Sequence, residues 1–511
     1  MKSHIIFGRQ TNRREHMRIL IACSWSLPHA GGVNTYVNQL EEGLKFAGHH
    51  VDIFSPTPDG QGFYIPGKEM AIDKAKLQPL IAHQSNHYMD HHLSGIDPWI
   101  TFSEVERYCF EAAAMYFGLA EYDIIHAQDI MSAHALSRVK PAHTPLVTTI
   151  HGCLTREWFV RLKTLGLTDQ DTNSPLWKYS ALREHLGATV SDVTISPSEW
   201  LKRVMVEDFA VPEPKIIVSH YGFDKEQFQQ NMLRDTMIVK PEGASVFLCP
   251  ARFDVVKGHI YLIHALVKLK AERSDWVCWL AGEGSLREEI MNITKDFGLG
   301  DHVIFLGNRE DVPALIHQAD FIVLPSMQDN QPFAVIEAQI AGKPVIASDA
   351  GGIPEMVTHA VNGLVFHAGD INELHLCLRS ALQDTNRLSS MASQAKEWGE
   401  RHWALPEMTN RVLALYELAR SKHPEQNEPQ TEQQAEQQIE PQIEPQIEPQ
   451  MAQQTELQSP VTPQQRGRRK WRANRRKKQP GAIKRKRKIR SKQRSKQRRF
   501  TRQRRFTRKR S

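Results

Sequence analysis

The run FIVLPSMQDNQPFAVIEAQIAGKPVIASDAGG, residues 321–352, decides the fold that we expect for this chain. It reads as an apolar strand, a polar loop that contains Asp329, an apolar helix that opens at Glu337, and a second apolar strand. Strands that are apolar throughout and joined by a helix are typical of a parallel sheet with helices on both faces. We therefore predict an α/β architecture around this stretch.

The same alternation of strands and helices extends in both directions along the chain. The second half contains the further apolar runs ASVFLCPAR, DWVCWLAGEG and HVIFLGN, separated by amphipathic stretches. The first half contains MRILIACS, VDIFSP, YDIIHAQ, PLVTTIHG, VTISPS and KIIVSH in a similar arrangement. Two Rossmann-like halves in sequence predict a central cleft, with ligands at the carboxyl ends of the strands. A chain of 511 residues is long enough for two such domains and additional tails.

The charge of the chain is divided between an acidic body and a basic tail. Residues 466–511 contain 26 of the 65 Lys and Arg residues and no acidic residue. The rest of the chain therefore carries 39 basic and 58 acidic side chains, a net charge of −19. The preceding Gln-, Glu- and Pro-rich residues 422–465 cannot bury a core, so we expect disorder there and in the tail. The tail favours salt-sensitive binding to an anionic polymer, a membrane surface or an acidic protein, and nucleic acid is an alternative partner.

Cysteine usage and the length of the apolar runs bear on the cellular compartment. The six cysteines are scattered with no CxxC pair, which favours a reducing compartment over a disulfide framework or a thiolate zinc site. The first residues lack the apolar core of a signal peptide, and translation could begin at Met1 or at Met17. No apolar run reaches about 18 residues, so we expect no transmembrane segment. These features predict a cytoplasmic protein, or one peripheral to the membrane or to a cell-envelope or spore-coat layer.

Two cations and two carboxylates form the first candidate site. Arg252 and Lys257 follow an apolar strand, and Asp329 and Glu337 lie eight positions apart. Arg offers a planar fork of donors and Lys a point charge, a pair suited to a diphosphate. Glu337 could accept hydrogen bonds from ribose hydroxyls and Asp329 from the hydroxyls of a sugar. These groups suggest a nucleotide-sugar site between the domains. Arg252, Lys257 and Asp329 would be catalytic, and Arg252, Lys257 and Glu337 would bind the donor.

Glycine pairs follow two of the predicted strands. Gly31 and Gly32 lie between the first strand and its helix, and Gly351 and Gly352 follow the last strand of the opening stretch. Glycine lets the backbone approach a phosphate closely, and a helix N-terminus favours an anion. We therefore expect all four glycines to contribute to donor binding.

Two histidines and a histidine-rich segment are further candidates. His126 and His151 each end a predicted strand on the cleft side. A neutral imidazole there could bond to the transferred sugar or to the acceptor, and we expect His126 to be catalytic and His151 to contact the acceptor or sugar. A purely structural role is the alternative for both. His83, His87 and His91 have a spacing that could hold a metal on one helix face, but nothing catalytic accompanies them, and we predict no metal site.

Taken together, these motifs resemble the GT-B glycosyltransferases of family 4, the retaining group 1 transferases. The resemblance covers about residues 17–421 and is strongest from Cys249 to Gly363. The family's carboxylate pair, its Arg and Lys diphosphate clamp, its N-terminal glycine loop and its strand-end histidine all have counterparts among the residues described above. The resemblance implies a GT-B fold and a metal-independent hexosyl transfer, without a cofactor, from a UDP- or GDP-sugar. The acceptor would be a glycan, lipid or small molecule in cell-envelope or polysaccharide synthesis, and the anomeric configuration would be retained.

The resemblance also suggests roles for the parts of the chain. From the N-terminus we expect a disordered segment (1–16), an acceptor domain (17–225), a nucleotide-sugar domain (226–397), a helix that crosses back to the first domain (398–421), a disordered linker (422–465) and the disordered basic tail (466–511). Acceptor specificity should reside in loops of the first domain, at Asp59–Gln84 and Cys153–Trp177.

Two departures from the family pattern keep alternatives open. The family usually has Glu where this chain has Asp329, and it often has a second histidine at the position of Gln128. A structural, coat-associated protein built on a degenerate transferase would fit these departures. A protein whose basic tail binds nucleic acid would fit the charge of residues 466–511. The presence of Arg252, Lys257 and Glu337 in one chain favours an active transferase.

Overall fold

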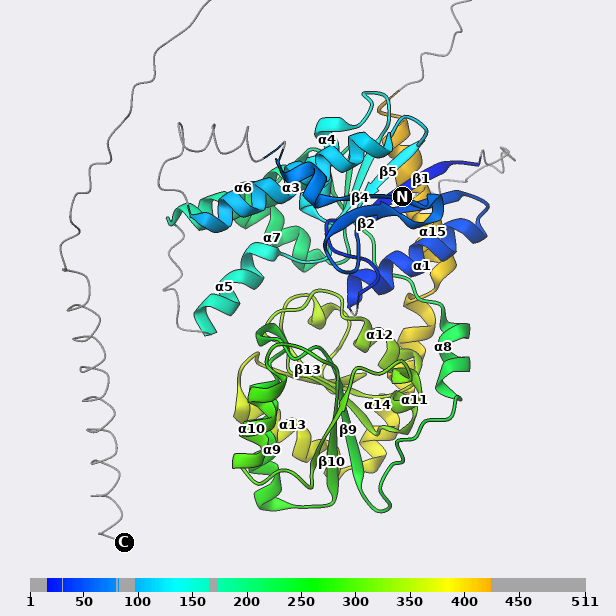
Figure 1. The fold of residues 1–511 in the computed structure, drawn as a ribbon. Coiled ribbons are helices and arrows are strands. Elements are labelled where there is room, and N and C mark those ends of the chain that lie inside the picture. The colour runs from blue at the N-terminus through cyan, green and yellow to red at the C-terminus, as the bar shows by residue number, and fades with distance from the viewer. Residues whose placement is uncertain (1–15, 30, 80, 82–96, 165–172, 424–511) are drawn as a thin grey trace, which may run out of the picture. The chain divides into compact units, whose positions relative to one another are not determined.

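The computed structural model describes residues 16–29, 31–79, 81, 97–164 and 173–423, which form two α/β domains (Figure 1). The basic tail, most of the linker and the segment with His83, His87 and His91 lie outside the described residues. Among the residues that are described, no cluster of three or more His, Cys, Asp and Glu could hold a metal ion. In the same residues, no helix combines the length and the apolar character needed to cross a membrane.

The first domain is built on an eight-stranded sheet with the order β4-β3-β2-β1-β5-β6-β7-β8. Its strands are β1 (Arg18–Ala22), β2 (His50–Pro56), β3 (Gly62–Ile65), β4 (Met70–Asp73), β5 (Ile124–Ala127), β6 (Leu146–Thr149), β7 (Val193–Ser196) and β8 (Ile216–Val218). Six neighbouring strands, in the order β2-β1-β5-β6-β7-β8, pair in parallel. Strand β3 pairs antiparallel with β2, and β4 pairs antiparallel with β3 at the edge of the sheet. The parallel part of this sheet agrees with the apolar runs of the sequence.

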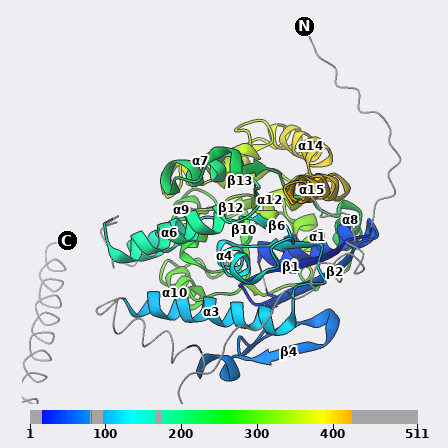
Figure 2. The ribbon, with the colours of Figure 1, turned by 90° about the horizontal axis from the view of Figure 1, so that it is seen from above.

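Helices cover both faces of the first sheet (Figure 2). They are α1 (Gly32–Phe46), α3 (Pro98–Phe117), α4 (Ile130–Val139), α5 (Leu154–Thr164), α6 (Pro175–Thr189) and α7 (Glu199–Phe209). Helices α3 and α4 pack on one face and α1 on the other. Four of the helices begin at a side chain that accepts hydrogen bonds from the first turn, which satisfies donors that the helix itself leaves free.

The second domain contains a six-stranded parallel sheet with the order β11-β10-β9-β12-β13-β14. Its strands are β9 (Ser245–Pro250), β10 (Trp276–Ala281), β11 (Val303–Gly307), β12 (Phe321–Leu324), β13 (Val345–Ser348) and β14 (Gly363–Phe366). The helices of this half are α8 (Lys225–Met232), α9 (His259–Glu272), α10 (Arg287–Asp296), α11 (Val312–Gln318), α12 (Phe333–Ile340), α13 (Ile371–Gln383) and α14 (Thr385–His402). Figure 1 shows α9, α10 and α13 on one side of the sheet and α11 and α14 on the other.

The central strand β9 shows why its sequence is apolar at every position. Val246 and Leu248 point into the core on one face of the sheet, which is continuous with the core of the first domain. Phe247 and Cys249 point into a second core beneath α9, α10 and α13. All four side chains have no exposed surface. Successive side chains of a strand face opposite sides, so a strand covered on both sides needs an unbroken apolar run.

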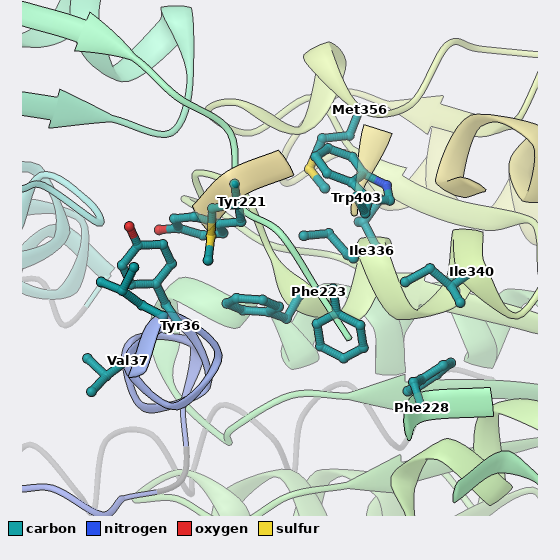
Figure 3. Packing of buried hydrophobic residues seen from close by; sticks show 14 of the residues in the cluster. Tyr36, Val37, Tyr221, Phe223, Phe228, Ile336, Ile340, Met356 and Trp403 are labelled. Atoms are coloured by element: carbon teal, nitrogen blue, oxygen red, sulfur yellow. The ribbon is translucent and has the colours of Figure 1, made fainter. Parts of the chain in front are cut away.

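An aromatic cluster joins the two domains beside α12 (Figure 3). Tyr36 of α1, Tyr221 and Phe223 of the β8–α8 connection, and Phe333 of α12 are all buried. The rings of Tyr221 and Phe333 are stacked with their centroids 5.1 Å apart, and those of Phe223 and Phe333 are 5.8 Å apart. Burial of this aromatic surface holds α12, and with it the backbone of Glu337, against the first domain.

The last helix, α15 (Leu405–Arg420), packs against α1 and the first sheet rather than against the second domain. The Phe223 amide donates to the carbonyl of Trp403 over 2.9 Å, so the two connections between the domains are bonded to each other. The chain therefore crosses back to its first domain at this helix.

The structure corrects two expectations about local structure. Glu337 lies at the fifth position of α12 and not in its first turn, because the helix begins directly after Pro332. Proline disfavours the helical conformation in the residue before it, so the helix does not extend upstream of Pro332. The segments expected as acceptor loops contain regular structure, with β3 and β4 inside 59–84 and α5 inside 153–177.

Candidate active site

A cavity of about 70 Å³ lies where the carboxyl ends of the strands of both domains meet, and we call it the interdomain cavity. His151, two residues beyond the end of β6, borders it from the first domain. Arg252 and Lys257 after β9 and Asp329 after β12 border it from the second. The structure thus brings together four of the residues selected from the sequence. Glu337 is not among the described residues that line this cavity.

Lys257 and Asp329 form an ion pair in this cavity. The Lys257 ammonium donates to Oδ2 of Asp329 over 2.5 Å. The same carboxylate accepts from the hydroxyl of Ser326 at 3.1 Å and from the amide of Asn330 at 3.2 Å. Both side chains are largely shielded from solvent. The Asp329 carboxylate is therefore a partly buried charge that three hydrogen bonds hold in place. A phosphate in the cavity would compete with Asp329 for Lys257.

Arg252 and Glu337 are ionisable groups to which the described residues give no hydrogen bond or ion pair. Arg252 is exposed, and in the part of the chain that the structure describes its guanidinium has no hydrogen bond or ion pair. The Glu337 carboxylate is likewise without a hydrogen bond or ion pair to any described residue. Burial raises the pKa of Glu337 to about 7. A cation and a carboxylate that the protein leaves free near the domain junction are suited to a ligand that carries both phosphates and hydroxyls.

The first glycine pair lies close to these groups but not in the cavity. A Cβ on Gly32 would lie 3.5 Å from the ring of Phe333 at the start of α12. Gly31 lies beside His29, whose pKa is lowered by burial and, more weakly, by the charge of Arg252. The loop of Gly31 and Gly32 therefore runs past α12 and near the guanidinium.

The second glycine pair serves the packing of the loop that carries Asp329. Gly351 has a φ of 64°, and a Cβ there would lie 1.7 Å from the carbonyl oxygen of Asp329. A Cβ on Gly352 would lie 2.4 Å from the carbonyl oxygen of Asn330. Neither glycine lines the interdomain cavity as the described residues define it. Their evident role is to let the β13 loop lie against the β12 loop, and a direct contact with the donor stays a prediction.

Replacing Gly351 with Ala should lower the free energy of unfolding by about 3 kcal/mol, because the new methyl group meets the Asp329 carbonyl in a conformation that already disfavours side chains. Gly60 is a matched control. It has a φ of 70°, but a Cβ on Gly60 would have nothing within 4 Å, so Gly60→Ala should cost only about 1 kcal/mol. Urea denaturation of both variants measures the difference. Equal losses would show that the close approach of the two loops has no energetic importance.

The two histidines occupy different environments. His126 is fully buried; its Nδ1 lies 2.8 Å from the hydroxyl of Tyr416 on α15, and its Nε2 lies 2.8 Å from the hydroxyl of Thr149. It does not line the interdomain cavity as described, in contrast to the catalytic position expected for it. His151 does line the cavity. Burial lowers the pKa of both histidines to about 3, so both are neutral at pH 7.

The hydrogen bonds of His151 define its tautomer. Its Nε2 faces Oε1 of Gln128 at 3.2 Å, and the amide nitrogen of Gln128 donates to the carbonyl of His126. Because that amide oxygen can only accept, Nε2 of His151 carries the proton. Its Nδ1 then accepts from the hydroxyl of Tyr221 at 2.6 Å. The donor Nε2–H has the longer and weaker bond, which makes it the nitrogen that can turn to a ligand hydroxyl.

Sequence reasoning missed several residues at the same site. Gln328 donates to the carbonyl of Cys153, and Asn330 donates to the carbonyl of His151 at 3.1 Å, so both tie the second domain to the first. Glu157 of α5 also borders the cavity. The amides could have been suspected from the polar run QDNQ between two apolar elements. Glu157 follows no motif, and only the fold places it here.

Comparisons with known proteins agree with this geometry. The family model described as "Glycosyltransferase Family 4" matches residues 30–227, and that described as "Glycosyl transferases group 1" matches residues 236–398. An uncharacterised glycosyltransferase of Methanocaldococcus jannaschii is 25% identical over 409 residues, 78% of this chain and 97% of the relative. The MMP alpha-(1->4)-mannosyltransferase of Mycolicibacterium hassiacum is 23% identical over 420 residues, 79% of this chain and 98% of the relative.

Solved structures show the same fold. The sucrose-phosphate synthase of Thermosynechococcus elongatus matches with a TM-score of 0.59 at 20% identity, covering 80% of this chain and all of that chain. HepE of Anabaena, in complex with UDP and glucose, matches with a TM-score of 0.55 at 20% identity, covering 79% of this chain and all of that chain. The fold and the family models define a glycosyltransferase with the GT-B fold, which confirms the predicted fold class. The chain belongs to glycosyltransferase family 4, the group 1 transferases.

Proposed function

We propose that this enzyme transfers a hexose from a UDP- or GDP-sugar to a glycan, lipid or small-molecule acceptor, with retention of the anomeric configuration. The observation that carries the proposal is that Arg252, Lys257, Asp329 and His151 surround one cavity between the domains. Two related facts favour a hexose donor. HepE, which has a similar fold, was solved with UDP and glucose, and curated relatives are named as a mannosyltransferase and as glycogen synthases.

The charges at the cavity fit the chemistry of such a transfer. When the bond between the anomeric carbon and the β-phosphate oxygen breaks, negative charge develops on the phosphate, and Arg252 and Lys257 would stabilise it. The sugar then resembles an oxocarbenium ion, and Asp329 and His151 would hold its hydroxyls. The acceptor oxygen bonds to the anomeric carbon on the face that the phosphate leaves, and the departing phosphate takes the acceptor's proton. In this proposal the side chains of Arg252 and Lys257, rather than a metal ion, supply the positive charge.

Binding of the donor requires the domains to separate. A cavity of about 70 Å³ is far smaller than the several hundred Å³ that ligand sites of this kind usually have. Besides the buried aromatic cluster beside α12, polar contacts join the domains near the cavity, among them the Ser198 hydroxyl with Asn330 and the Glu355 carboxylate with the amides that begin α7. Breaking these contacts would open the site, and their return would exclude water during transfer.

A panel of UDP-, GDP- and ADP-hexoses tests the proposal. At 100 times the dissociation constant, the right donor should stabilise the protein by about 2.7 kcal/mol and raise the melting temperature by a few degrees. The same donor should release its nucleoside diphosphate in the presence of the enzyme. A protein that neither binds nor turns over any sugar nucleotide would instead be the structural protein considered as the alternative.

Donor affinity should rise with pH through about 7 and level off above it. The reason is that the ribose hydroxyls would donate to the ionised form of Glu337, whose pKa burial raises to about 7. Binding should therefore favour the carboxylate and release a proton. Calorimetry at pH 6, 7 and 8, in buffers that differ in ionisation enthalpy, measures both effects.

The variant Glu337→Gln provides the control for this pH dependence. It should weaken donor binding by about tenfold and abolish the proton release, because the amide does not titrate. Burial also raises the pKa of Glu184 to about 7, and Glu184 is unchanged in this variant. Any pH dependence that the variant keeps would therefore come from Glu184 or another group and not from Glu337. A wild-type affinity that is flat between pH 6 and 8 would contradict the role given to Glu337.

A further inference from the structure

A second and larger cavity, of about 320 Å³, lies wholly within the first domain, and we call it the aromatic cavity. Helices α3, α5 and α6 border it, together with the residues after β1 and the start of α4. Four aromatic side chains line it: Trp25, Trp99, Phe102 and Trp158. Three of them are well exposed, with 48% of Trp25, 61% of Phe102 and 37% of Trp158 accessible. Exposed aromatic rings gathered around a hollow mark a binding site more often than a packing defect.

A buried carboxylate faces the same cavity with one oxygen unpaired. Glu184 of α6 has no exposed surface, and its Oε1 accepts from the amide of Thr155 at 2.8 Å. Its Oε2 is buried and has no hydrogen-bond partner among the residues that the structure describes. A buried acceptor without a donor costs free energy, and native proteins rarely leave one so unless a ligand or water supplies the donor. Glu184 lines the aromatic cavity, so an occupant with a hydroxyl that reaches Oε2 would supply the missing partner.

A second carboxylate connects the two cavities. Glu157 of α5 lines both the aromatic cavity and the interdomain cavity. No hydrogen bond or ion pair engages its side chain among the residues that the structure describes. Its Oε1 lies 2.9 Å from where a Cβ of Gly152 would be, so that glycine leaves room for it. A molecule bound in the aromatic cavity could thus extend along Glu157 into the interdomain cavity, where the reacting sugar would lie.

The cations of the aromatic cavity, in contrast, are already engaged. The Arg161 guanidinium forms two bonds with Asp254, at 3.0 and 3.2 Å. Arg183 donates to the hydroxyl of Ser103 at 2.6 Å and lies over the ring of Trp99 at 5.8 Å. The charged groups that stay free on the wall are therefore carboxylates, and no free cation among the described lining residues awaits an anion. This charge distribution disfavours a phosphorylated occupant.

We propose, on the basis of the function proposed above, that the aromatic cavity binds the acceptor and that this acceptor is a neutral saccharide. The C–H face of a sugar ring is slightly positive and suits the negative face of Trp or Phe. Its hydroxyls supply the donors that Glu184 and Glu157 lack. A bare hydrocarbon would give no partner to Oε2 of Glu184 or to the Glu157 carboxylate, and a phosphate would be repelled by their ionised forms. Glu157 then orients the hydroxyl that is to receive the transferred sugar.

Saccharide binding can be tested without the donor. We would titrate the wild-type protein with maltotriose, mannotriose, galactobiose and chitobiose and follow tryptophan fluorescence, because three tryptophans border the cavity. At least one saccharide should give a saturable change. Phe102→Ala and Glu184→Gln should each weaken that binding by about tenfold or more. Met115→Ala is the matched control, since Met115 is 67% exposed on α3 but does not line the cavity, and it should bind as the wild type does.

Glucose 6-phosphate and 1-octanol serve as probes for the two rejected classes of occupant. Tighter binding of either than of every saccharide, with the same sensitivity to Phe102→Ala, would overturn the proposal, as would the absence of any saccharide binding. Because Phe102 is exposed, its variant should fold even if Glu184→Gln does not. Donor binding is measured separately by thermal shift. A protein that binds saccharide but no sugar nucleotide contradicts the proposed function alone, and one that binds sugar nucleotide but no saccharide contradicts this inference alone.

Discussion

Replacing Lys257 with Ala should lower the rate of nucleoside diphosphate release from the donor by about 100- to 1,000-fold. The ammonium is fixed by Asp329 and lies next to the place where the leaving phosphate would sit. Its charge is most valuable when the phosphate becomes more negative, so the loss should appear mainly in kcat. The variant also leaves Asp329 without its charged partner, and the carboxylate would then repel the donor. Steady-state kinetics with the donor found in the panel measures the effect.

Two further variants separate the charge of Lys257 from general damage. Lys257→Arg keeps the charge with a different geometry and should recover part of the rate. Lys268→Ala removes an exposed lysine of α9 that donates to Asn372, and it should leave the rate unchanged. The melting temperatures of all three show whether the fold is intact. A folded Lys257→Ala enzyme with the wild-type rate would exclude this residue from the chemistry.

The neighbourhood of Lys257 and Asp329 illustrates what the sequence could predict. Both residues follow apolar runs, and the carboxyl ends of parallel strands meet at one edge of a sheet. The strands β9 and β12 are direct neighbours in the sheet although about 70 residues separate them. The apolar runs themselves were recognisable because each strand is buried on both faces. Local composition was therefore enough to predict the sheet and the convergence of these side chains.

The position of Glu337 and the presence of Glu157 show where this reasoning ends. The start of α12 depends on Pro332 and on the packing of Phe333 against Tyr221, which no motif around Glu337 encodes. Glu157 belongs to a helix in a stretch that was expected to form a loop. Its approach to Lys257 depends on how the two domains meet. Such contacts between distant segments have no local signature in a single sequence.

The different environments of the two histidines have the same origin. His126 and His151 both follow or end apolar strands, and their sequence contexts are alike. What distinguishes them is Tyr416, which lies 290 residues after His126 and returns on α15 to bond with it. That helix covers His126 and leaves His151 at the cavity. The expected catalytic role of His126 is therefore better proposed for His151.

Replacing His151 with Ala should reduce kcat by about 100-fold or more, whereas replacing His126 with Ala should chiefly destabilise the protein. His151 offers Nε2–H at the interdomain cavity, where it would hold a hydroxyl of the reacting sugar. His126 is fully buried, and its loss would leave the hydroxyls of Tyr416 and Thr149 unpaired around a void. That loss should cost about 2–4 kcal/mol of unfolding free energy. Kinetics and urea denaturation of both variants distinguish the two roles.

Acid titration gives an independent check on His126. Burial lowers its pKa to about 3, so the folded state keeps the ring neutral while the unfolded chain takes up a proton below about pH 6.5. This histidine therefore contributes stability that is present above pH 6.5 and is lost as the pH falls toward 3. His126→Ala should show a shallower loss of stability between pH 6.5 and 4 than the wild type. The structural role given to His126 is contradicted if His126→Ala is as stable as the wild type yet inactive, because loss of a purely structural histidine would lower stability.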